Sequence, residues 1–177
     1  GMDIPLHFIA VEDDNTRARA GLQRNRCAAN AKFRYVSFMD ADDIMHSRRL
    51  EVLASTIQKH SPKAVVHDYK NLLKRNCNLK GIAFKLPETP NLTLGEELYD
   101  TEGGKKPDRF HGFKHHRLHN GHVTVEKEVF TDIEQHDDLA CGLCEDTVFN
   151  LDILKRYGRR NDSLIFVQSH LSSWYKK

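Results

Sequence analysis

The sequence lacks long hydrophobic runs and has few cysteines. No apolar segment approaches the ~20 residues that cross a bilayer, and the first residues lack the charged-then-apolar pattern of an export signal. Only Cys141 and Cys144 have paired spacing, so a four-cysteine zinc knuckle lacks its second half. We therefore expect a cytoplasmic protein with no transmembrane segment and with free thiols; the alternative is a redox or zinc role for this pair.

The chain also lacks a large excess of charge of either sign. Its 177 residues include 27 Lys and Arg against 25 Asp and Glu, for a net charge of +2. A nucleic-acid-binding role would need a local basic face on such a protein, so we expect no nucleic-acid partner. The length and the 39% hydrophobic share fit one globular domain over residues 1–177.

Strand-like and helix-like patterns alternate through the first seventy residues. Residues 4–11 and 34–39 have the apolar character of strands, and residues 64–67 predict a short third strand. Helices are predicted over residues 16–31 and from Ser47, a candidate N-cap, onward. This alternation predicts an α/β layer arrangement with parallel strands.

The pattern weakens over residues 71–122, where proline and glycine interrupt it repeatedly. We expect an irregular lid or acceptor-side segment here, with a hairpin near residues 79–86 and a short helix near residues 94–99. Order returns at residues 123–130, and a second clear helix is predicted over residues 145–157. A final strand over residues 163–168 precedes a tail.

Three carboxylates crowd into the four positions that follow the strand predicted at residues 34–39: Asp40, Asp42 and Asp43. Two like charges ~4 Å apart repel by about 4 kcal/mol at an effective dielectric near 20, so something must compensate. Ligands gather beyond the carboxyl ends of strands in open parallel sheets, and such oxygen ligands suit Mg²⁺ or Mn²⁺. The alternative is that these residues cap the following helix.

Several segments together resemble family 2 glycosyltransferases, which have the GT-A fold. The resemblance rests on Arg24-Asn25, residues 35–39, Asp40-Ala41-Asp42-Asp43, Arg49-Leu50, residues 121–130 and residues 145–150, in that order and spacing. It implies an α/β, GT-A-like sandwich with a mainly parallel central sheet. Only about twenty residues precede Arg24, so part of the first βαβ unit is expected to be missing.

The resemblance also implies a donor site. Asp40 and Asp42 would face the nucleotide sugar, and Arg24 would border the donor pocket. Asp42 would contact the divalent cation, Mn²⁺ or Mg²⁺. Some relatives supply a further metal ligand from a histidine near the end of the domain, and His170 occupies such a position.

On the acceptor side, the resemblance makes Asp146 the general base and Glu145 a residue that holds the acceptor. The implied reaction is metal-dependent transfer of a sugar from a nucleoside-diphosphate sugar to a carbohydrate or other hydroxyl acceptor, with inversion. Such transfer needs a base at the acceptor hydroxyl and a cation at the departing diphosphate. Asp146 should stay ionised in the first turn of a helix; the alternative is that it only caps that helix.

Two other functions compete with this one. A shortened GT-A-like domain could be an inactive binding or assembly module that pairs an exposed sheet edge with a second copy. The Asp40-Ala41-Asp42 spacing also fits a haloacid-dehalogenase phosphatase, although no convincing partner residues follow in order.

The irregular segment contains five histidines within twelve residues: His111, His115, His116, His119 and His122. Some have the helical spacing of zinc ligands. The alternative is a polar, partly exposed loop near the acceptor side, where histidines meet anionic groups.

Overall fold

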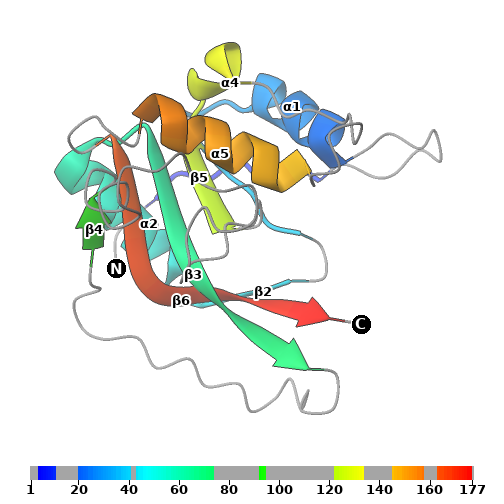
Figure 1. The fold of residues 1–177 in the computed structure, drawn as a ribbon, viewed down its shortest axis with the longest axis vertical. Helices are drawn as coiled ribbons and strands as arrows, with labels where there is room; N and C mark the ends of the chain where they lie inside the picture. Colours follow the sequence, from blue (N-terminus) through cyan, green and yellow to red (C-terminus); the bar gives the residue numbers. More distant parts are fainter. Residues whose placement is uncertain are drawn as a thin grey trace.

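The computed structural model describes residues 4–10, 20–40, 43–73, 92–94, 122–133, 145–157 and 163–176. These residues form a twisted sheet with helices on both faces (Figure 1). The helices are α1 (Ala20–Asn30), α2 (Arg49–His60), α4 (Val129–Asp132) and α5 (Glu145–Tyr157). The strands are β1 (Tyr35–Ser37), β2 (Ile44–Met45), β3 (Ala64–Leu73), β4 (Leu92–Leu94), β5 (Val123–Glu126) and β6 (Leu164–Lys176).

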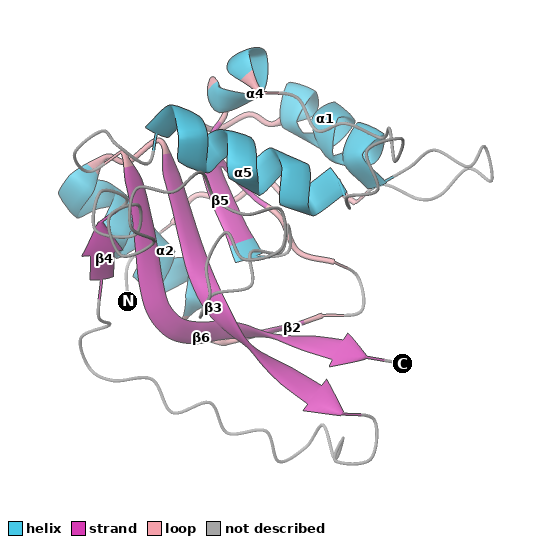
Figure 2. Cartoon of the chain, viewed as in Figure 1, coloured by secondary structure: helices cyan, strands magenta, loops and turns pink. Residues whose placement is uncertain are grey.

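The strands lie in the order β1-β5-β3-β6-β2, and β4 also pairs with β6 (Figure 2). Parallel pairing, which the sequence predicts as the main arrangement, is found between β3 and β6, whereas the other four pairs are antiparallel. The α/β layers are therefore confirmed, but the sheet is more mixed than predicted. A fully buried strand such as β5 has the same apolar pattern whether it runs parallel or antiparallel to its neighbours, so its own residues do not encode its orientation.

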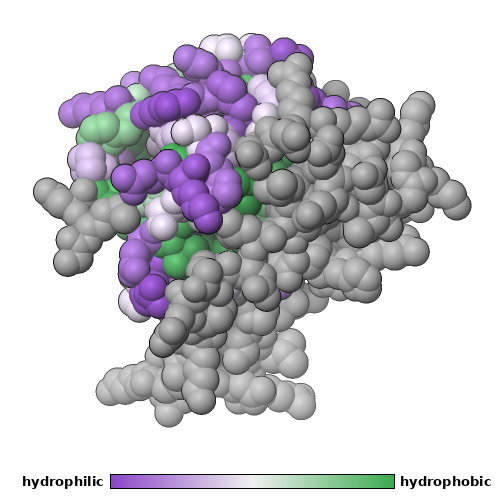
Figure 3. All heavy atoms as spheres, turned by 90° about the vertical axis from the view of Figure 1, so that its left-hand side faces the viewer, coloured by the Kyte–Doolittle hydropathy of each residue, from purple (hydrophilic) through white to green (hydrophobic). Residues whose placement is uncertain are grey.

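Two apolar clusters hold the helices against the sheet. The larger cluster packs α1, α4 and α5 on one face, with Phe149 of α5 and Phe166 of β6 among its most buried members. The smaller cluster packs Val52 and Leu53 of α2 against the other face. Hydrophilic residues cover much of the described surface in the view of Figure 3. Helices α2 and α5 thus owe their place to an apolar stripe, as expected for helices on a sheet.

The helix predictions are largely confirmed. Helix α5 has the predicted bounds, and α1 lies within the predicted range. Helix α2 begins later than Ser47, because Arg48 is its N-cap residue and has no side-chain cap. Instead, the Arg48 amide donates to Nδ1 of His46 at 3.0 Å, and the His46 amide donates to the Leu171 carbonyl of β6 at 2.9 Å.

The strand predictions need three corrections. Residues 4–10 form no strand, and Phe8 is 89% exposed. Strand β3 continues beyond residue 67 to Leu73, and β6 continues beyond residue 168 to Lys176, where a tail was expected. The two strands extend because they pair with each other along their whole length, across register shifts at Asp68. Polar residues in their outer halves are held by strand pairing, which an apolar pattern does not reveal.

The predicted hairpin at residues 79–86 lies outside the described residues, as does most of the predicted irregular segment. Where residues 71–122 are described, they belong to β3 and β4 or lead into β5 at His122. Leu94 ends β4, and the rest of the helix expected near residues 94–99 is outside the description. None of the described helices combines the length and apolar character that crossing a membrane requires.

Candidate active site

The carboxylates of residues 40–43, here called the acidic turn, follow the carboxyl end of β1. The Asp43 amide donates to the Asp40 carbonyl at 3.1 Å, which closes the turn. Asp42, which lies between them, is outside the described residues. The turn therefore stands where ligands gather in open α/β sheets, while the role of Asp42 stays a prediction.

Asp40 forms an ion pair with Arg24, the residue that the resemblance places at the border of the donor pocket. Nη2 of Arg24, on α1, donates to Oδ1 of Asp40 at 2.8 Å. The Arg24 and Asp40 side chains keep 14% and 26% of their surface exposed. A charge-assisted bond at this partial burial is stronger than a surface ion pair, and it fixes α1 against the end of β1.

Asp43 is buried, and its charge acts on Arg49 at the start of α2. Asp43 is 6% exposed and Arg49 is 1% exposed. Burial lowers the pKa of Arg49 to about 10, although the negative charge of Asp43 acts in the opposite direction. Nη2 of Arg49 also donates to the Phe38 carbonyl at 2.7 Å and to Oγ of Ser37 at 3.1 Å. The guanidinium thus joins α2 to the last residues before the turn.

Part of the repulsion in the acidic turn is offset by the chain itself. The carboxylate of Asp40 binds the guanidinium of Arg24, and the charge of buried Asp43 acts on Arg49. The N-cap residue of α2 is Arg48, which is none of these carboxylates, and it has no side-chain cap. The expectation that a bound cation offsets the rest of the charge stays a prediction.

His170 lies in β6, close in the sheet to the strand that follows the acidic turn. Its backbone is in register with Asp68 of β3. Three residues further along β6, Ser173 is the partner of Ile44 in β2. The sheet thus brings the predicted metal ligand near the acidic turn in the backbone, but its side chain is outside what the structure describes, so its role stays a prediction.

Glu145 and Asp146 are the first two residues of α5, as the sequence predicts. Phe149 and Ile153 of the same helix are buried against the sheet. In Figure 1 the start of α5 and the end of β1 lie towards the same side of the view. The positive end of α5 favours the charged form of carboxylates there, whereas the side-chain contacts of both residues are outside the description.

A buried polar cluster behind the acidic turn was not predicted. His122 is fully buried, forms a hydrogen bond through Nδ1 with Oγ of Ser172 at 2.6 Å, and stacks on Tyr69 with ring centroids 4.2 Å apart. His67 lies 5.3 Å from His122 between ring centroids. Burial, followed by the charges of Arg49 and His122, holds the pKa of His67 well below 6.5.

This burial corrects the interpretation of His122 as part of an exposed loop, whereas the zinc interpretation, which pairs His122 with His119, stays untested. The other four histidines of that group, and Cys141 with Cys144, lie outside the described residues. His67 and His122 each sit beside an apolar run in the sequence, a sign of burial that could have singled them out.

In the part of the chain that the structure describes, no three His, Cys, Asp or Glu side chains come together as a metal site. The donor chemistry still fits a divalent cation held by few protein ligands. Asp40 keeps a quarter of its side chain exposed although Arg24 binds one oxygen, and Mg²⁺ needs only one or two carboxylates when phosphates complete its shell.

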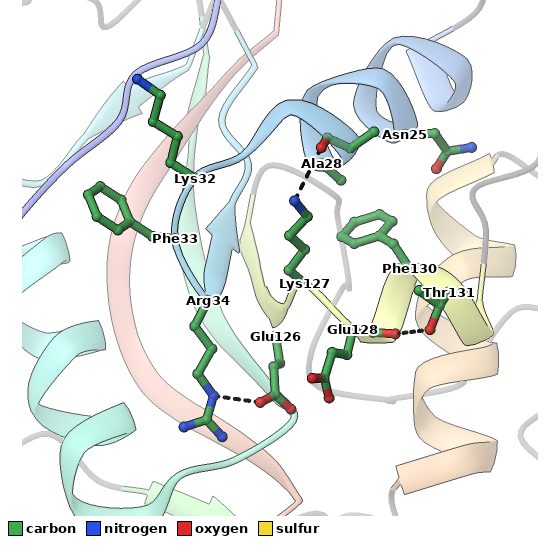
Figure 4. Close-up of a pocket in the computed structure, with 11 residues that line it drawn as sticks. Asn25, Ala28, Lys32, Phe33, Arg34, Glu126, Lys127, Glu128, Phe130 and Thr131 are labelled. Carbon is green, nitrogen blue, oxygen red and sulfur yellow. Dashed lines mark hydrogen bonds and ion pairs between the residues drawn. The ribbon is translucent and has the colours of Figure 1, made fainter.

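A separate cavity of about 560 Å³ lies at the other end of β1 (Figure 4). Its walls include Phe33, Arg34, Glu126, Lys127 and Phe130. Nε of Arg34 donates to Oε1 of Glu126 at 2.6 Å. Nζ of Lys127 donates to the Ala31 carbonyl at 2.8 Å. The cavity thus lies at the opposite end of β1 from the acidic turn.

The fold and the acidic turn together define an α/β domain of the GT-A class. The chain belongs to glycosyl transferase family 2, since the model of that family matches residues 6–114. The family confirms the resemblance seen in the sequence and argues against the phosphatase alternative. Comparison with curated proteins found no significant match.

Three solved structures of S. aureus TarS 1-349 share the fold. The complex with UDP-GlcNAc has a TM-score of 0.54 and 15% identity, and the match covers 87% of this chain and 38% of TarS. The structure without a named ligand has a TM-score of 0.56 and 14% identity, and the match covers 89% of this chain and 40% of TarS 1-349. The UDP complex has a TM-score of 0.53 and 14% identity, and the match covers 87% of this chain and 39% of TarS 1-349. This chain therefore spans about two fifths of the length of each of these structures.

Proposed function

We propose that this chain is a domain of a glycosyltransferase that moves a sugar from a nucleoside-diphosphate sugar to a hydroxyl acceptor. The observation that carries the proposal is the acidic turn at the carboxyl end of β1, braced by the Arg24–Asp40 bond, in a chain of glycosyl transferase family 2. The UDP and UDP-GlcNAc complexes of TarS support a uridine nucleotide as the first donor to test.

On the donor side, Asp40 faces the nucleotide sugar while Arg24 fixes the position of its carboxylate. Asp42 holds a Mn²⁺ or Mg²⁺ ion, with His170 as a further ligand. When bound, this ion neutralises the charge that grows on the departing diphosphate. The partial exposure of Asp40 supports this assignment, because a fully buried carboxylate could not reach a ligand.

On the acceptor side, Glu145 holds the acceptor and Asp146 removes the proton from its hydroxyl group. The acceptor oxygen then bonds to the anomeric carbon while the bond from that carbon to the diphosphate oxygen breaks. Attack from the face opposite the diphosphate inverts the configuration. The place of both residues at the start of α5 supports this role, because the positive end of a helix favours the ionised form of a carboxylate.

The test compares Asp146→Asn with Asp42→Asn, using Asp152→Asn as the control. Asp152 is on α5 and bonds to Lys155 on the surface, so its substitution removes the same charge outside the site. Asp146→Asn should lower transfer from UDP-GlcNAc by roughly 10²–10⁴-fold and leave UDP binding unchanged. Asp42→Asn should weaken both. Normal transfer by the two site variants would show that the roles are wrongly assigned.

Thermal unfolding tests the alternative of an inactive assembly domain, including a homo-oligomer joined at a sheet edge. A donor site must stabilise the fold when it is occupied, by about 2.7 kcal/mol at a ligand concentration a hundred times Kd. Melting is therefore measured with Mn²⁺ and UDP or GDP, and the absence of any shift with either nucleotide would favour the assembly domain.

A further inference from the structure

Strand β1 lies at an edge of the sheet, and no other described strand pairs with its outer side. On its inner side it pairs with β5, and the Phe38 amide donates to the Val123 carbonyl at 3.2 Å. Because the backbone groups of an antiparallel strand alternate in direction, those of Tyr35, Ser37 and Met39 point to the outer side. The outer side of β1 is therefore a row of backbone donors and acceptors that can bind a further strand.

The outer side of β1 lacks the features by which proteins keep sheet edges from pairing. Residues 35–39 contain no proline and no charged side chain. Ser37 and Met39 are exposed, and Met39 keeps 42% of its surface accessible although it is apolar. Val36 and Phe38, between them, are buried in the core, which holds the strand in place. The edge is thus fixed, accessible and unprotected.

The charges that flank β1 are complementary to those of a second copy that runs antiparallel to it. Pairing about Ser37 puts Arg34 of one copy opposite Asp40 of the other, and it does so at both ends of the paired segment. The Arg34 side chain is 63% exposed and the Asp40 side chain is 26% exposed, so both can be reached. Lys32 and Arg34 line the same cavity, so the cation of Lys32 also lies on this side (Figure 4). This complementarity favours a second copy over an unrelated strand.

We propose that two copies of this chain pair along the outer side of β1 as an antiparallel, two-fold symmetric dimer. In the register about Ser37, the outward backbone groups of Tyr35 face those of Met39 in the copy, as an antiparallel ladder requires. Pairing of two identical edges uses up both of them, so the assembly closes at the dimer. The proposal is independent of the proposed function, because self-association is measured without nucleotide and does not require sugar transfer.

Sedimentation equilibrium of the whole chain over a range of concentrations measures the dimer dissociation constant. Met39→Pro removes an outward amide that bonds to none of the described residues, whereas Met39→Ala keeps this amide and removes the side chain. We expect Met39→Pro to weaken dimerisation by about tenfold or more, because two symmetry-related hydrogen bonds are lost and the proline ring blocks the edge. Met39→Ala should have a smaller effect.

A second pair of variants tests the charges. Lys32→Glu reverses a charge near Asp40 of the copy at both ends of the segment, so it should weaken dimerisation by about tenfold. Lys59→Glu is the matched control, because Lys59 is exposed in the last turn of α2, on another element. The control should stay within about twofold of the unmodified chain. In amide hydrogen exchange, the Tyr35 and Ser37 amides should exchange more slowly as the dimer forms.

A chain that stays monomeric at every concentration would overturn the inference and leave the edge to a different strand. A dimer that Met39→Pro and Lys32→Glu leave unchanged would also overturn it, because the contact would then lie elsewhere. Equal losses in Lys32→Glu and Lys59→Glu would show that overall charge, not this register, controls association. If Met39→Pro does not fold, Lys32→Glu and its control decide the matter. A dimer with these properties that binds no UDP would leave this inference standing and refute the proposed function.

Discussion

Phe149 links the predicted general base to the core, and its substitution separates acceptor-side from donor-side effects. It lies three residues after Asp146 on α5 and is fully buried. Its ring stacks on Phe130 of α4 with centroids 5.4 Å apart. Because a residue and the one three positions later share a helix face, loss of this ring should shift the first turn of α5.

The stability cost of Phe149→Leu follows from these contacts. Losing the aromatic pair costs about 0.5–1.5 kcal/mol beyond the lost area, and an apolar replacement of similar volume costs up to about 1.5 kcal/mol. The sum is about 0.5–3 kcal/mol, against a total stability of about 5–15 kcal/mol, so the variant should fold. For a chain of this length, about 2 kcal/mol corresponds to a fall in Tm of about 4–8 °C.

Activity should fall more than stability suggests. A shift of about 1 Å in a catalytic group can cost about a hundredfold in rate, so transfer should drop while UDP affinity is kept. Transfer and UDP titrations are therefore measured well below the Tm. Val65→Ala is the control, because this buried valine packs on the opposite face, with α2, and its loss should cost about 2 kcal/mol.

Equal losses of UDP affinity and transfer rate in Phe149→Leu would refute this reasoning, because the helix start would then not be the affected part. An unchanged Tm would show that the ring does not contribute the packing inferred from its burial. A comparable rate loss in Val65→Ala would show that reduced stability alone, without displacement of α5, explains the effect.

Two further predictions concern pH. Burial alone would raise the pKa of Glu126, but hydrogen bonds from Lys63 and Arg34 outweigh burial and hold the pKa below its usual value. The stabilisation that ionised Glu126 contributes is therefore present at neutral pH and is lost as the pH falls through the folded-state pKa. Glu126→Gln should then lower the urea midpoint at pH 7 more than near pH 3. A depressed pKa keeps His67 neutral in the folded protein while the unfolded chain takes up a proton below pH 6.5. Stability should then fall from pH 7 to 5 in urea titrations, and a His67→Gln variant that keeps the same slope would contradict this.

Helices were the most predictable part of the fold. In α2, apolar residues at Leu53 and Ile57 recur with helical spacing, and both lie against the sheet. In α5 the pattern ends at Tyr157, where the helix ends. One amphipathic stripe contains most of the information that places a helix, because the stripe alone shows which face is buried.

Strands were less predictable, because their partners lie far away in the sequence. Residues 4–10 are apolar enough for a strand but pair with no described strand, and Phe8 stays exposed. By contrast, the polar residues 68–71 of β3 are held in the sheet by parallel pairing with β6. The buried contact between His122 and Ser172 likewise joins residues 50 positions apart, and no local pattern predicts such a contact.

The acidic turn shows how far local charge can be used to infer a ligand. Its crowding correctly marked the end of β1, yet crowding alone did not reveal that Arg24 arrives from α1 and Arg49 from the start of α2. Once Arg24 is placed, part of the repulsion in the cluster is offset within the chain. The case for a donor site therefore rests on the position of the turn and on family membership more than on the crowding of the carboxylates.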